Sequence, residues 1–310
     1  MTDISTYQFN HSMIRVKDPE ASLKFYKLLG LSVLQELKLP DYGLDLYFVA
    51  YDSPASTSHS KLLSDREGVI ELNYTYGIKK THSGNEDPKG FGHICVSVDN
   101  IQAACNRLAD AGCEFQSTLR NGSAFVLDPD GYWIQLIAHN AVHETEQVAI
   151  TDVQSYRVNH TMLRVKDKGA SLRFYEGVLG MTLQHEHRNA AAGFDSVFLG
   201  YGPSGAGRSI EDPNPDADRE GLLELNWTYG TEKGDGVAYH NGNSEPEGFG
   251  HICISVDDIY AACERLEALN VRWQKRLMDG PFRVAFAYDP DDYLVEVIQN
   301  ERFKSAGHEY

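Results

Sequence analysis

The stretch NHSMIRVKD at residues 10–18 returns almost unchanged as NHTMLRVKD at residues 159–167. Three further stretches repeat in the same order along the chain. They are REGVIELNYTYG (66–77) with REGLLELNWTYG (219–230), GFGHICVSV (90–98) with GFGHICISV (248–256), and LDPDGYWIQL (127–136) with YDPDDYLVEV (288–297). Self-similarity of this kind indicates a duplicated structural unit. A chain of 310 residues is long enough for two such units, each with its own core.

The repeat predicts two domains, at 7–140 and 157–301, joined by a polar linker at 141–156 that has no clear periodicity. The spacing between equivalent residues grows along the chain, so the halves differ by insertions. One insertion is predicted before Arg219. The segment 203–218 there is rich in Gly, Pro and Asp, which is typical of a loop.

Each half alternates helix and strand signals. A helix is predicted to begin at Asp18 and Pro19 and to end at Gly30, and Asp99 and Asp258 are predicted to cap two further helices. The strands expected in the first half are 10–16, 44–51, 69–76, 93–98 and 132–138. A βα unit followed by several strands therefore occurs twice in each half, which gives four modules. The predicted class is α+β, with mostly antiparallel sheets curved around a site.

Composition places the chain among globular proteins and excludes several classes of function. Hydrophobic residues make up 42% and charged residues 24%, as in ordinary folded domains. A net charge of -17 would repel phosphate backbones, so nucleic acid is not an expected partner. No apolar run approaches the roughly 20 residues that span a bilayer, and the N-terminus lacks a signal-peptide layout. We therefore expect a cytoplasmic protein without membrane association. The five cysteines form no CxxC pair, which favours reduced thiols.

Several predicted strands carry one side chain of a metal-ligand type among apolar neighbours. A carboxylate in the middle of a buried strand is costly unless a cation or a donor meets it. Taken singly, such a His or Glu also fits a hydrogen-bonded or ion-paired structural residue. The candidates form one His2Glu2 group and a partial copy, namely His11, Glu71, His251 and Glu296, with His160, Glu224 and His93 recurring. Imidazole plus carboxylate ligation suits Zn, Ni, Co or Mn, so the set predicts a metal site.

These motifs, in this order and occurring twice, resemble glyoxalase I of the vicinal-oxygen-chelate group in its fused two-domain form. The resemblance covers about residues 7–300. It implies βαβββ modules, a monomer, and sites that each combine the first module of one half with the second module of the other. It also implies two ligand sets, His11, Glu71, His251 and Glu296 at site one, and His160, Glu224, His93 and Gln135 at site two. Gln135 stands where the family has its fourth carboxylate, so site two is expected to be degenerate.

The resemblance also implies residues that hold glutathione. Arg15 matches the family's carboxylate-binding arginine, with Arg164 as its repeat, although a surface ion pair is the alternative for Arg15. Lys275 and Arg283 match the two ends of a basic loop. Thr75 occupies the place of an asparagine that contacts the substrate.

Other positions depart from the family pattern. Lys89 and Glu247 replace an arginine, and Glu247 is expected to weaken an anionic contact at site one. At site two, Ser117 takes the place of Lys275 and the basic loop is shorter. Site two therefore lacks both the positive charge of the basic loop and part of the loop itself.

The reaction implied is the isomerisation of the methylglyoxal–glutathione hemithioacetal to S-D-lactoylglutathione through a metal-bound enediolate. The resemblance assigns the base to Glu296, with Glu71 opposite it, and glutathione is the co-substrate. Gln135 cannot accept a proton at neutral pH. One divalent ion is expected for each intact site, Zn2+ first, with Ni2+ or Co2+ as alternatives.

Two rival functions share the fold. An Fe(II) extradiol-type dioxygenase would use two histidines and one carboxylate, and the second carboxylate of site one argues against it. A non-catalytic protein could keep the fold and only bind a ligand. An intact base at Glu296 favours the enzyme.

Overall fold

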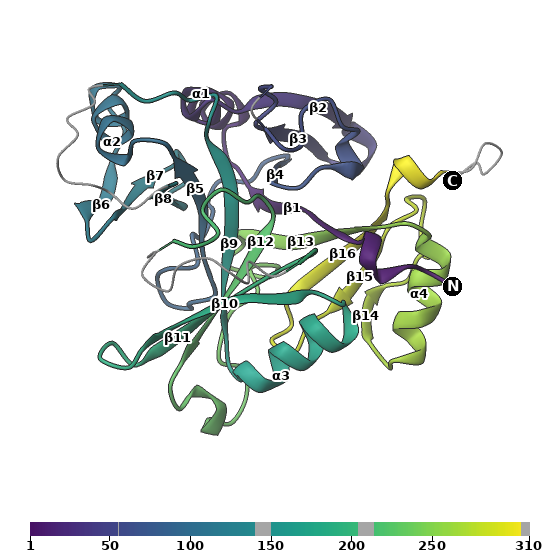
Figure 1. Cartoon of the computed structure of the whole chain (residues 1–310). Helices are drawn as coiled ribbons and strands as arrows, with labels where there is room; N and C mark the ends of the chain where they lie inside the picture. Colours follow the sequence, from purple (N-terminus) through teal and green to yellow (C-terminus); the bar gives the residue numbers. More distant parts are fainter. Residues whose placement is uncertain (55, 140–149, 204–213, 305–310) are drawn as a thin grey trace.

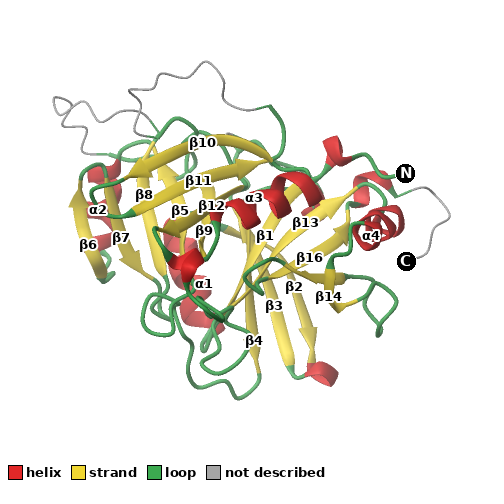
Figure 2. Cartoon of the chain, turned by 90° about the horizontal axis from the view of Figure 1, so that it is seen from below, coloured by secondary structure: helices red, strands yellow, loops and turns green. Residues whose placement is uncertain are grey.

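The computed structural model describes residues 1–54, 56–139, 150–203 and 214–304. Within these ranges the chain forms sixteen strands in two eight-stranded sheets (Figures 1 and 2). Much of the expected linker at 141–156 and of the loop insertion at 203–218 lies outside the described residues. The domain boundaries at 7–140 and 157–301 stay a prediction.

Four βαβββ modules follow one another along the chain. Module 1 contains β1 (Gln8–Arg15), α1 (Pro19–Leu29), β2 (Ser32–Leu39), β3 (Leu44–Ala50) and β4 (Val69–Thr75). Module 2 contains β5 (Phe91–Val98), α2 (Ile101–Asp110), β6 (Phe115–Arg120), β7 (Ser123–Leu127) and β8 (Trp133–Ala138). Module 3 contains β9 (Arg157–Val165), α3 (Lys168–Leu172) with a π-helical turn (Arg173–Val178), β10 (Thr182–Asn189), β11 (Phe194–Gly200) and β12 (Leu222–Thr228). Module 4 contains β13 (Phe249–Val256), α4 (Ile259–Ala268), β14 (Arg272–Lys275), β15 (Ala285–Tyr288) and β16 (Leu294–Gln299).

Each sheet combines modules from both halves of the chain. The first sheet has the order β14-β15-β16-β13-β1-β4-β3-β2 and joins modules 4 and 1. The second has the order β10-β11-β12-β9-β5-β8-β7-β6 and joins modules 3 and 2. In each sheet five strand pairs are antiparallel and two are parallel, which confirms the predicted α+β class with mostly antiparallel sheets. In the view of Figure 1, α1 and α2 lie in the upper part of the molecule and α3 and α4 in the lower part.

The repeated GFG motifs join the halves. Phe91 and Phe249 are buried, and their rings stack with centroids 4.9 Å apart and planes 9° apart. Within each half a tyrosine connects the two sheets, because the Tyr132 hydroxyl donates to the Arg15 carbonyl and the Tyr293 hydroxyl donates to the Arg164 carbonyl. One hydrophobic cluster includes residues from all four modules. The first sheet therefore depends on packing that both halves supply.

The predicted helix ends are mostly confirmed. The Asp18 side chain accepts from the backbone N–H groups of the first helical turn of α1, and Gly30 ends the helix with φ of 101°. Asp258 caps α4 in the same way. The cap predicted at Asp99 is wrong by one residue, because Asn100 caps α2 and Asp99 instead accepts from Thr151 Oγ1.

The sequence missed the outer strands of each sheet. In the first half these are β2, β6 and β7. Every residue of β2 is exposed or half-buried, so the strand has little of the apolar alternation that marks a buried face. Outer strands are held by pairing to a central strand, which a local pattern does not reveal.

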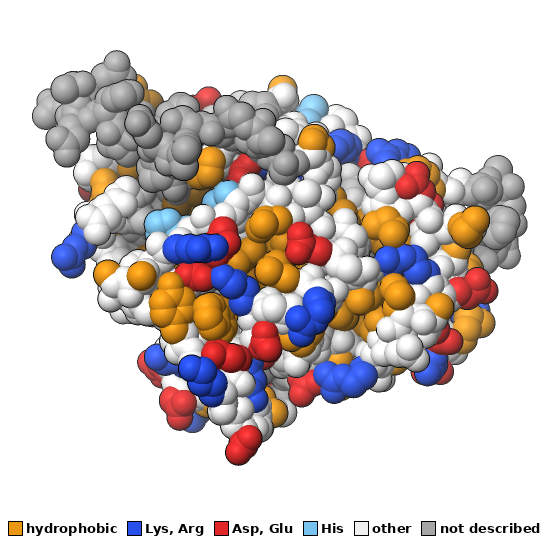
Figure 3. All heavy atoms as spheres, turned by 60° about the horizontal axis from the view of Figure 1, so that its bottom comes forward, with side chains coloured by type: hydrophobic (Ala, Val, Ile, Leu, Met, Phe, Trp, Pro, Cys, Tyr) orange, Lys and Arg blue, Asp and Glu red, His pale blue; other side chains and the backbone are white. Residues whose placement is uncertain are grey.

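The surface carries charges of both signs. On the face shown in Figure 3, Lys and Arg side chains are interspersed with Asp and Glu. Among the described residues, none of the helices is long and apolar enough to cross a membrane.

Candidate metal centre

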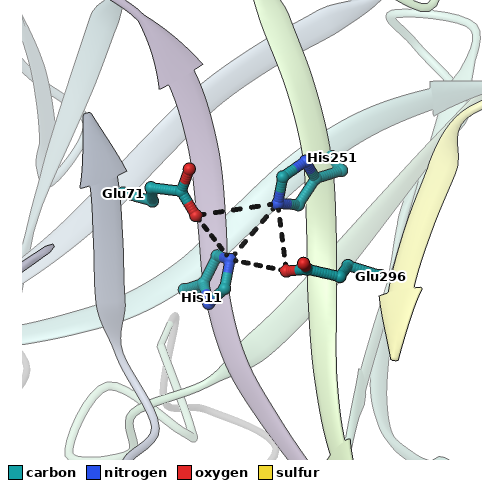
Figure 4. Close-up of side chains that lie close together, drawn as sticks. All are labelled: His11, Glu71, His251 and Glu296. Atoms are coloured by element: carbon teal, nitrogen blue, oxygen red, sulfur yellow. Dashed lines mark hydrogen bonds and ion pairs between the residues drawn. The ribbon is translucent and has the colours of Figure 1, made fainter. Parts of the chain in front are cut away.

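Four side chains predicted as metal ligands converge in the middle of the first sheet. They come from adjacent strands and are His11 on β1, Glu71 on β4, His251 on β13 and Glu296 on β16 (Figure 4). His11 Nε2 lies 3.0 Å from Glu71 Oε2, 3.2 Å from Glu296 Oε2 and 3.2 Å from His251 Nε2. His251 Nε2 lies 3.3 Å from Glu296 Oε2 and 3.8 Å from Glu71 Oε2. One atom from each side chain therefore points at a common centre.

The register of the sheet explains this convergence. Met13 on β1 pairs with His251 on one side and with Glu71 on the other. Glu296 pairs with Cys253, two residues beyond His251. Because side chains alternate between the faces of a strand, these pairings turn the four ligand-type side chains to one face.

The donor set fits a divalent metal ion. Two atoms that each lie about 2.0–2.1 Å from one ion at a tetrahedral angle are roughly 3.4 Å apart, close to the spacing of the four ligand atoms. All four residues are buried, with no more than 8% of their surface exposed. Two buried carboxylates balance the charge of a divalent cation, which removes the cost of burying them.

Asn10 holds His11 in the orientation that a metal ligand needs. The side-chain oxygen of Asn10 accepts a hydrogen bond from His11 Nδ1 at 2.7 Å. With the proton held on Nδ1, a neutral ring would present the lone pair of Nε2 to an ion at the centre. The Asn10 amide donates to the carbonyls of Leu63 and Arg66, at 2.8 Å each. Sequence reasoning missed Asn10, although the repeated Asn-His dipeptide was a signal for it.

The electrostatics of the cluster favour an ionised Glu296. Burial raises the pKa of Glu296, but the charge of His251 and hydrogen bonds from both imidazoles outweigh it and hold the pKa well below the usual value. Burial lowers the pKa of His11, whereas Cys253 and the two carboxylates raise it well above the usual value. The cluster thus concentrates negative charge around two imidazoles.

The centre opens into a cavity of about 920 Å³. One wall is apolar and comes from β2, β3 and the loop before β4. Its residues are Leu37, Leu39, Leu44, Leu46, Phe48 and Leu63. The opposite wall includes Phe282, Phe286 and Tyr288 from module 4. A cavity of this size, apolar with a few convergent polar groups, is typical of a small-molecule site.

A second, smaller cluster lies in the second sheet. His160 Nε2 lies 3.1 Å from Glu224 Oε2 and 3.2 Å from His93 Nε2, and His93 Nε2 lies 3.5 Å from Glu224 Oε2. Gln135 pairs with Cys95 as Glu296 pairs with Cys253, so it holds the fourth position. Its Nε2 donates to Ser123 Oγ, and its buried Oε1 has no hydrogen-bond partner among the described residues.

Comparisons with known proteins show the family and the fold. A family model described as the Glyoxalase/Bleomycin resistance protein/Dioxygenase superfamily matches residues 8–136 and 157–297. A lactoylglutathione lyase from Schizosaccharomyces pombe is 44% identical over 97% of this chain and 99% of its own length. The chain belongs to the glyoxalase I family. Another member, glyoxalase I from Saccharomyces cerevisiae, is 37% identical over 94% of this chain and 92% of its own. The crystal structure of glyoxalase I from Zea mays shares the fold, with a TM-score of 0.70 and 23% identity over 96% of this chain and 94% of that chain.

The family resemblance placed four substrate-binding residues, and two of them line the cavity. Arg15 lines it, with its guanidinium donating to the carbonyls of Gly242 and Phe249 and to Asn243 Oδ1. Glu247 Oε2 lies 4.0 Å from Arg15 Nε, near the same end. Arg283 also lines the cavity. Arg164 makes the same type of contacts in the second sheet, to Gly84, Gly90, Phe91 and Asn85.

The other two residues do not line the cavity. Lys275 Nζ donates to the carbonyls of Phe282 and Val284, so its charge holds its own loop. Thr75 donates to Asn73 Oδ1, and it is Asn73 that reaches the cavity.

Sequence reasoning also missed residues at the cavity mouth. Tyr42 and Phe282 come from different halves, and their ring centroids are 4.8 Å apart. Glu301 and Lys304 line the cavity from the segment after β16. None of these residues belongs to a repeated motif, so the sequence offered no signal for them.

Proposed function

We propose that this chain is a lactoylglutathione lyase, which isomerises the methylglyoxal–glutathione hemithioacetal to S-D-lactoylglutathione at site one. The observation that carries the proposal is the His2Glu2 centre opening into the cavity, in a chain whose full-length relatives bear that name. The relatives are lyases, and the fourth carboxylate is present at this site.

Each side chain of the centre has a part in this proposal. A divalent ion held by His11, Glu71, His251 and Glu296 would stabilise the negative charge that develops on the substrate oxygens. Glu296 takes the proton from the carbon that bears sulfur, which leaves an enediolate. Return of the proton to the neighbouring carbon gives the thioester and the new hydroxyl, so the reaction is a balanced isomerisation. Glu71 faces Glu296 across His11 and completes the ligand set.

The cavity binds and orients the substrate. We place the carboxylates of glutathione at Arg15 and Arg283, because both line the cavity and are always charged. Lys275 acts by holding the loop that carries Arg283, and Thr75 by orienting Asn73. The walls exclude water from the enediolate, which limits side reactions.

The finer features follow the same proposal. Zn2+ is the first candidate for the metal, with Ni2+ and Co2+ as alternatives, because imidazole and carboxylate ligands accept all three. A single chain supplies both halves of the site, so a monomer in the cytoplasm suffices.

Neither rival function matches the centre as well. A dioxygenase of the facial-triad type would leave one of the two carboxylates of site one without a part. A binding protein would not need a base at Glu296.

The test is steady-state turnover of the hemithioacetal by the metal-reconstituted chain. Glu296→Gln should lower the rate by about 10²–10⁴-fold, the usual contribution of a general base, while the metal content stays near that of the wild type. Glu224→Gln, at site two, is the matched control and should leave the rate nearly unchanged. A Glu296→Gln enzyme with wild-type turnover would refute the proposal.

A further inference from the structure

The second sheet carries polar side chains where the first sheet lines its cavity with leucines. The strand registers show which residues correspond. Gln35, Phe48 and Glu71 lie on one row across β2, β3 and β4, and His185, Phe198 and Glu224 lie on the matching row across β10, β11 and β12. The next two rows pair Leu37 with Leu46 and Leu39 with Leu44 in the first sheet. Their counterparts are His187 with Ser196 and Asn189 with Phe194.

At one further position, a leucine of site one is replaced by a charged residue beside site two. The amide of Asn10 donates to the carbonyl of Leu63, and the amide of Asn159 donates to the carbonyl of Asp216. Asp216 therefore takes the place of Leu63, which lines the cavity of site one. We call His185, His187, Asn189, Ser196 and Asp216 the polar wall. It replaces Gln35 and four leucines, whereas Phe194 and Phe198 stay apolar, so the surface beside site two is more polar than the matching wall of site one.

Residues of the polar wall contact the candidate ligands of site two, either directly or through Phe198. His185 Nδ1 lies 2.7 Å from Asp216 Oδ2, and the His185 ring stacks on Phe198 with centroids 4.1 Å apart and planes 14° apart. Phe198 in turn contacts the His160 ring at 5.2 Å. Because Asp216 accepts from Nδ1, the Nε2 atom of His185 is left for a ligand. Ser196 Oγ donates to Glu224 Oε1 at 2.5 Å and orients that carboxylate.

The two sites also differ in the net charge that a bound divalent ion and its ligands would have. A divalent ion on His11, Glu71, His251 and Glu296 would be neutralised by two carboxylates. The same ion on His93, His160, Glu224 and the Gln135 carbonyl would keep one positive charge. A residual positive charge beside a polar wall favours an anionic ligand with hydroxyl or carbonyl groups.

We propose that site two binds a divalent ion and, beside it, a small 2-hydroxycarboxylate held by His185, and that it does not take the hemithioacetal. His93, His160, Glu224 and Gln135 hold the ion. The carboxylate of the ligand meets the residual charge, and its polar face meets the polar wall. This site is distinct from the proposed lyase site and needs no turnover there.

The test uses the full chain and two binding measurements. Equilibrium dialysis with Co2+ should give two ions per wild-type chain, and about one for either the double variant Glu71→Gln/Glu296→Gln or Glu224→Gln, because each of these changes leaves its site without a carboxylate. Calorimetry with lactate on the Co2+-loaded chain should show one binding event that survives in the double variant. Lactate affinity should fall by about tenfold or more in Glu224→Gln and in His185→Gln, which installs the residue found at the matching position 35. Lactamide, which lacks the charge, should bind about tenfold more weakly than lactate.

Two controls keep the result interpretable. Arg188→Gln alters an exposed residue of β10 that lies between two wall residues on the opposite face, and it should bind lactate like the wild type. Asp216→Asn removes the charge behind His185 without removing the ring, and it should also weaken lactate binding. This variant replaces His185→Gln in the test if His185→Gln does not fold. One Co2+ per wild-type chain would overturn the proposal, as would lactate binding that is unchanged by Glu224→Gln and by both wall variants. Neither result would bear on Glu296→Gln turnover, so the two proposals fail separately.

Discussion

Replacing Asn10 by alanine tests how site one is supported, because Asn10 holds the proposed ligand His11 in place without being a candidate ligand itself. Its buried side chain makes three hydrogen bonds, to His11 Nδ1 at 2.7 Å and to the carbonyls of Leu63 and Arg66 at 2.8 Å. Loss of the partner that orients a ligand histidine lowers metal affinity by about 10–100-fold, or about 1.4–2.7 kcal/mol. The orphaned buried carbonyls should lower the free energy of unfolding by roughly 2–4 kcal/mol.

Asn159→Ala is the matched control for Asn10→Ala. Asn159 makes the same three bonds in the second sheet, to His160 Nδ1 and to the carbonyls of Asp216 and Arg219. Both variants should lose similar stability in urea unfolding. Only Asn10→Ala should raise the free metal concentration needed for half-maximal turnover of the hemithioacetal. If both variants needed the same free metal concentration for half-maximal turnover, Asn10 would not orient His11 as we propose.

Three further predictions concern other parts of the molecule. Phe91→Ala should lower the free energy of unfolding by about 3–5 kcal/mol, measured in urea, because the ring is buried and stacked on Phe249; a loss below about 1 kcal/mol would contradict the shared core. Burial raises the pKa of Glu67 to about 7 despite the charges of Arg219 and Lys61, so the folded state binds the proton more tightly than the unfolded state. The free energy of unfolding should therefore fall by about 1–2 kcal/mol as the pH rises from about 4.5 to 7, for this partly exposed group. Thermal unfolding between pH 5 and 8 measures this slope, and Glu67→Gln should flatten it. Gln135→Glu should raise Co2+ affinity at site two by about tenfold in dialysis, because it adds a carboxylate ligand, yet leave hemithioacetal turnover near the wild-type rate. A doubled rate would show that the polar wall admits the hemithioacetal.

The central strands and the convergence of their candidate ligands were predictable from the sequence because they repeat. Motifs that place His11 and Glu71 in apolar strands also mark those strands as buried, so fold and candidate ligands came from one pattern. Strand β2 was missed because its residues are exposed or half-buried, and β6 and β7 likewise pair at the outer part of a sheet. Asp99 was mistaken for a cap because Asp and Asn are equally good at that position, and only the backbone geometry distinguishes them.

Side-chain direction was the main limit on predicting the cavity. Lys275 lies in the expected strand, but its ammonium group satisfies carbonyls of its own loop, which no spacing rule reveals. Thr75 and Asn73 share a face of β4, and only the position along the strand decides which of them reaches the cavity. The polar wall required the strand register, because His187 and Ser196 lie on different strands and only the pairing of β10 with β11 places them side by side.

The central claim is that residues from both halves of the chain form one active site, and combining Glu71→Gln with Glu296→Gln tests it most directly. Residues that act as a unit are not additive, so the double variant should turn over the hemithioacetal no more slowly than the worse single variant, and each single variant should lose most of the activity. Two independent sites would behave differently. Each single variant would then keep about half of the wild-type rate and the double variant would lose nearly all of it, and that result would contradict the shared site.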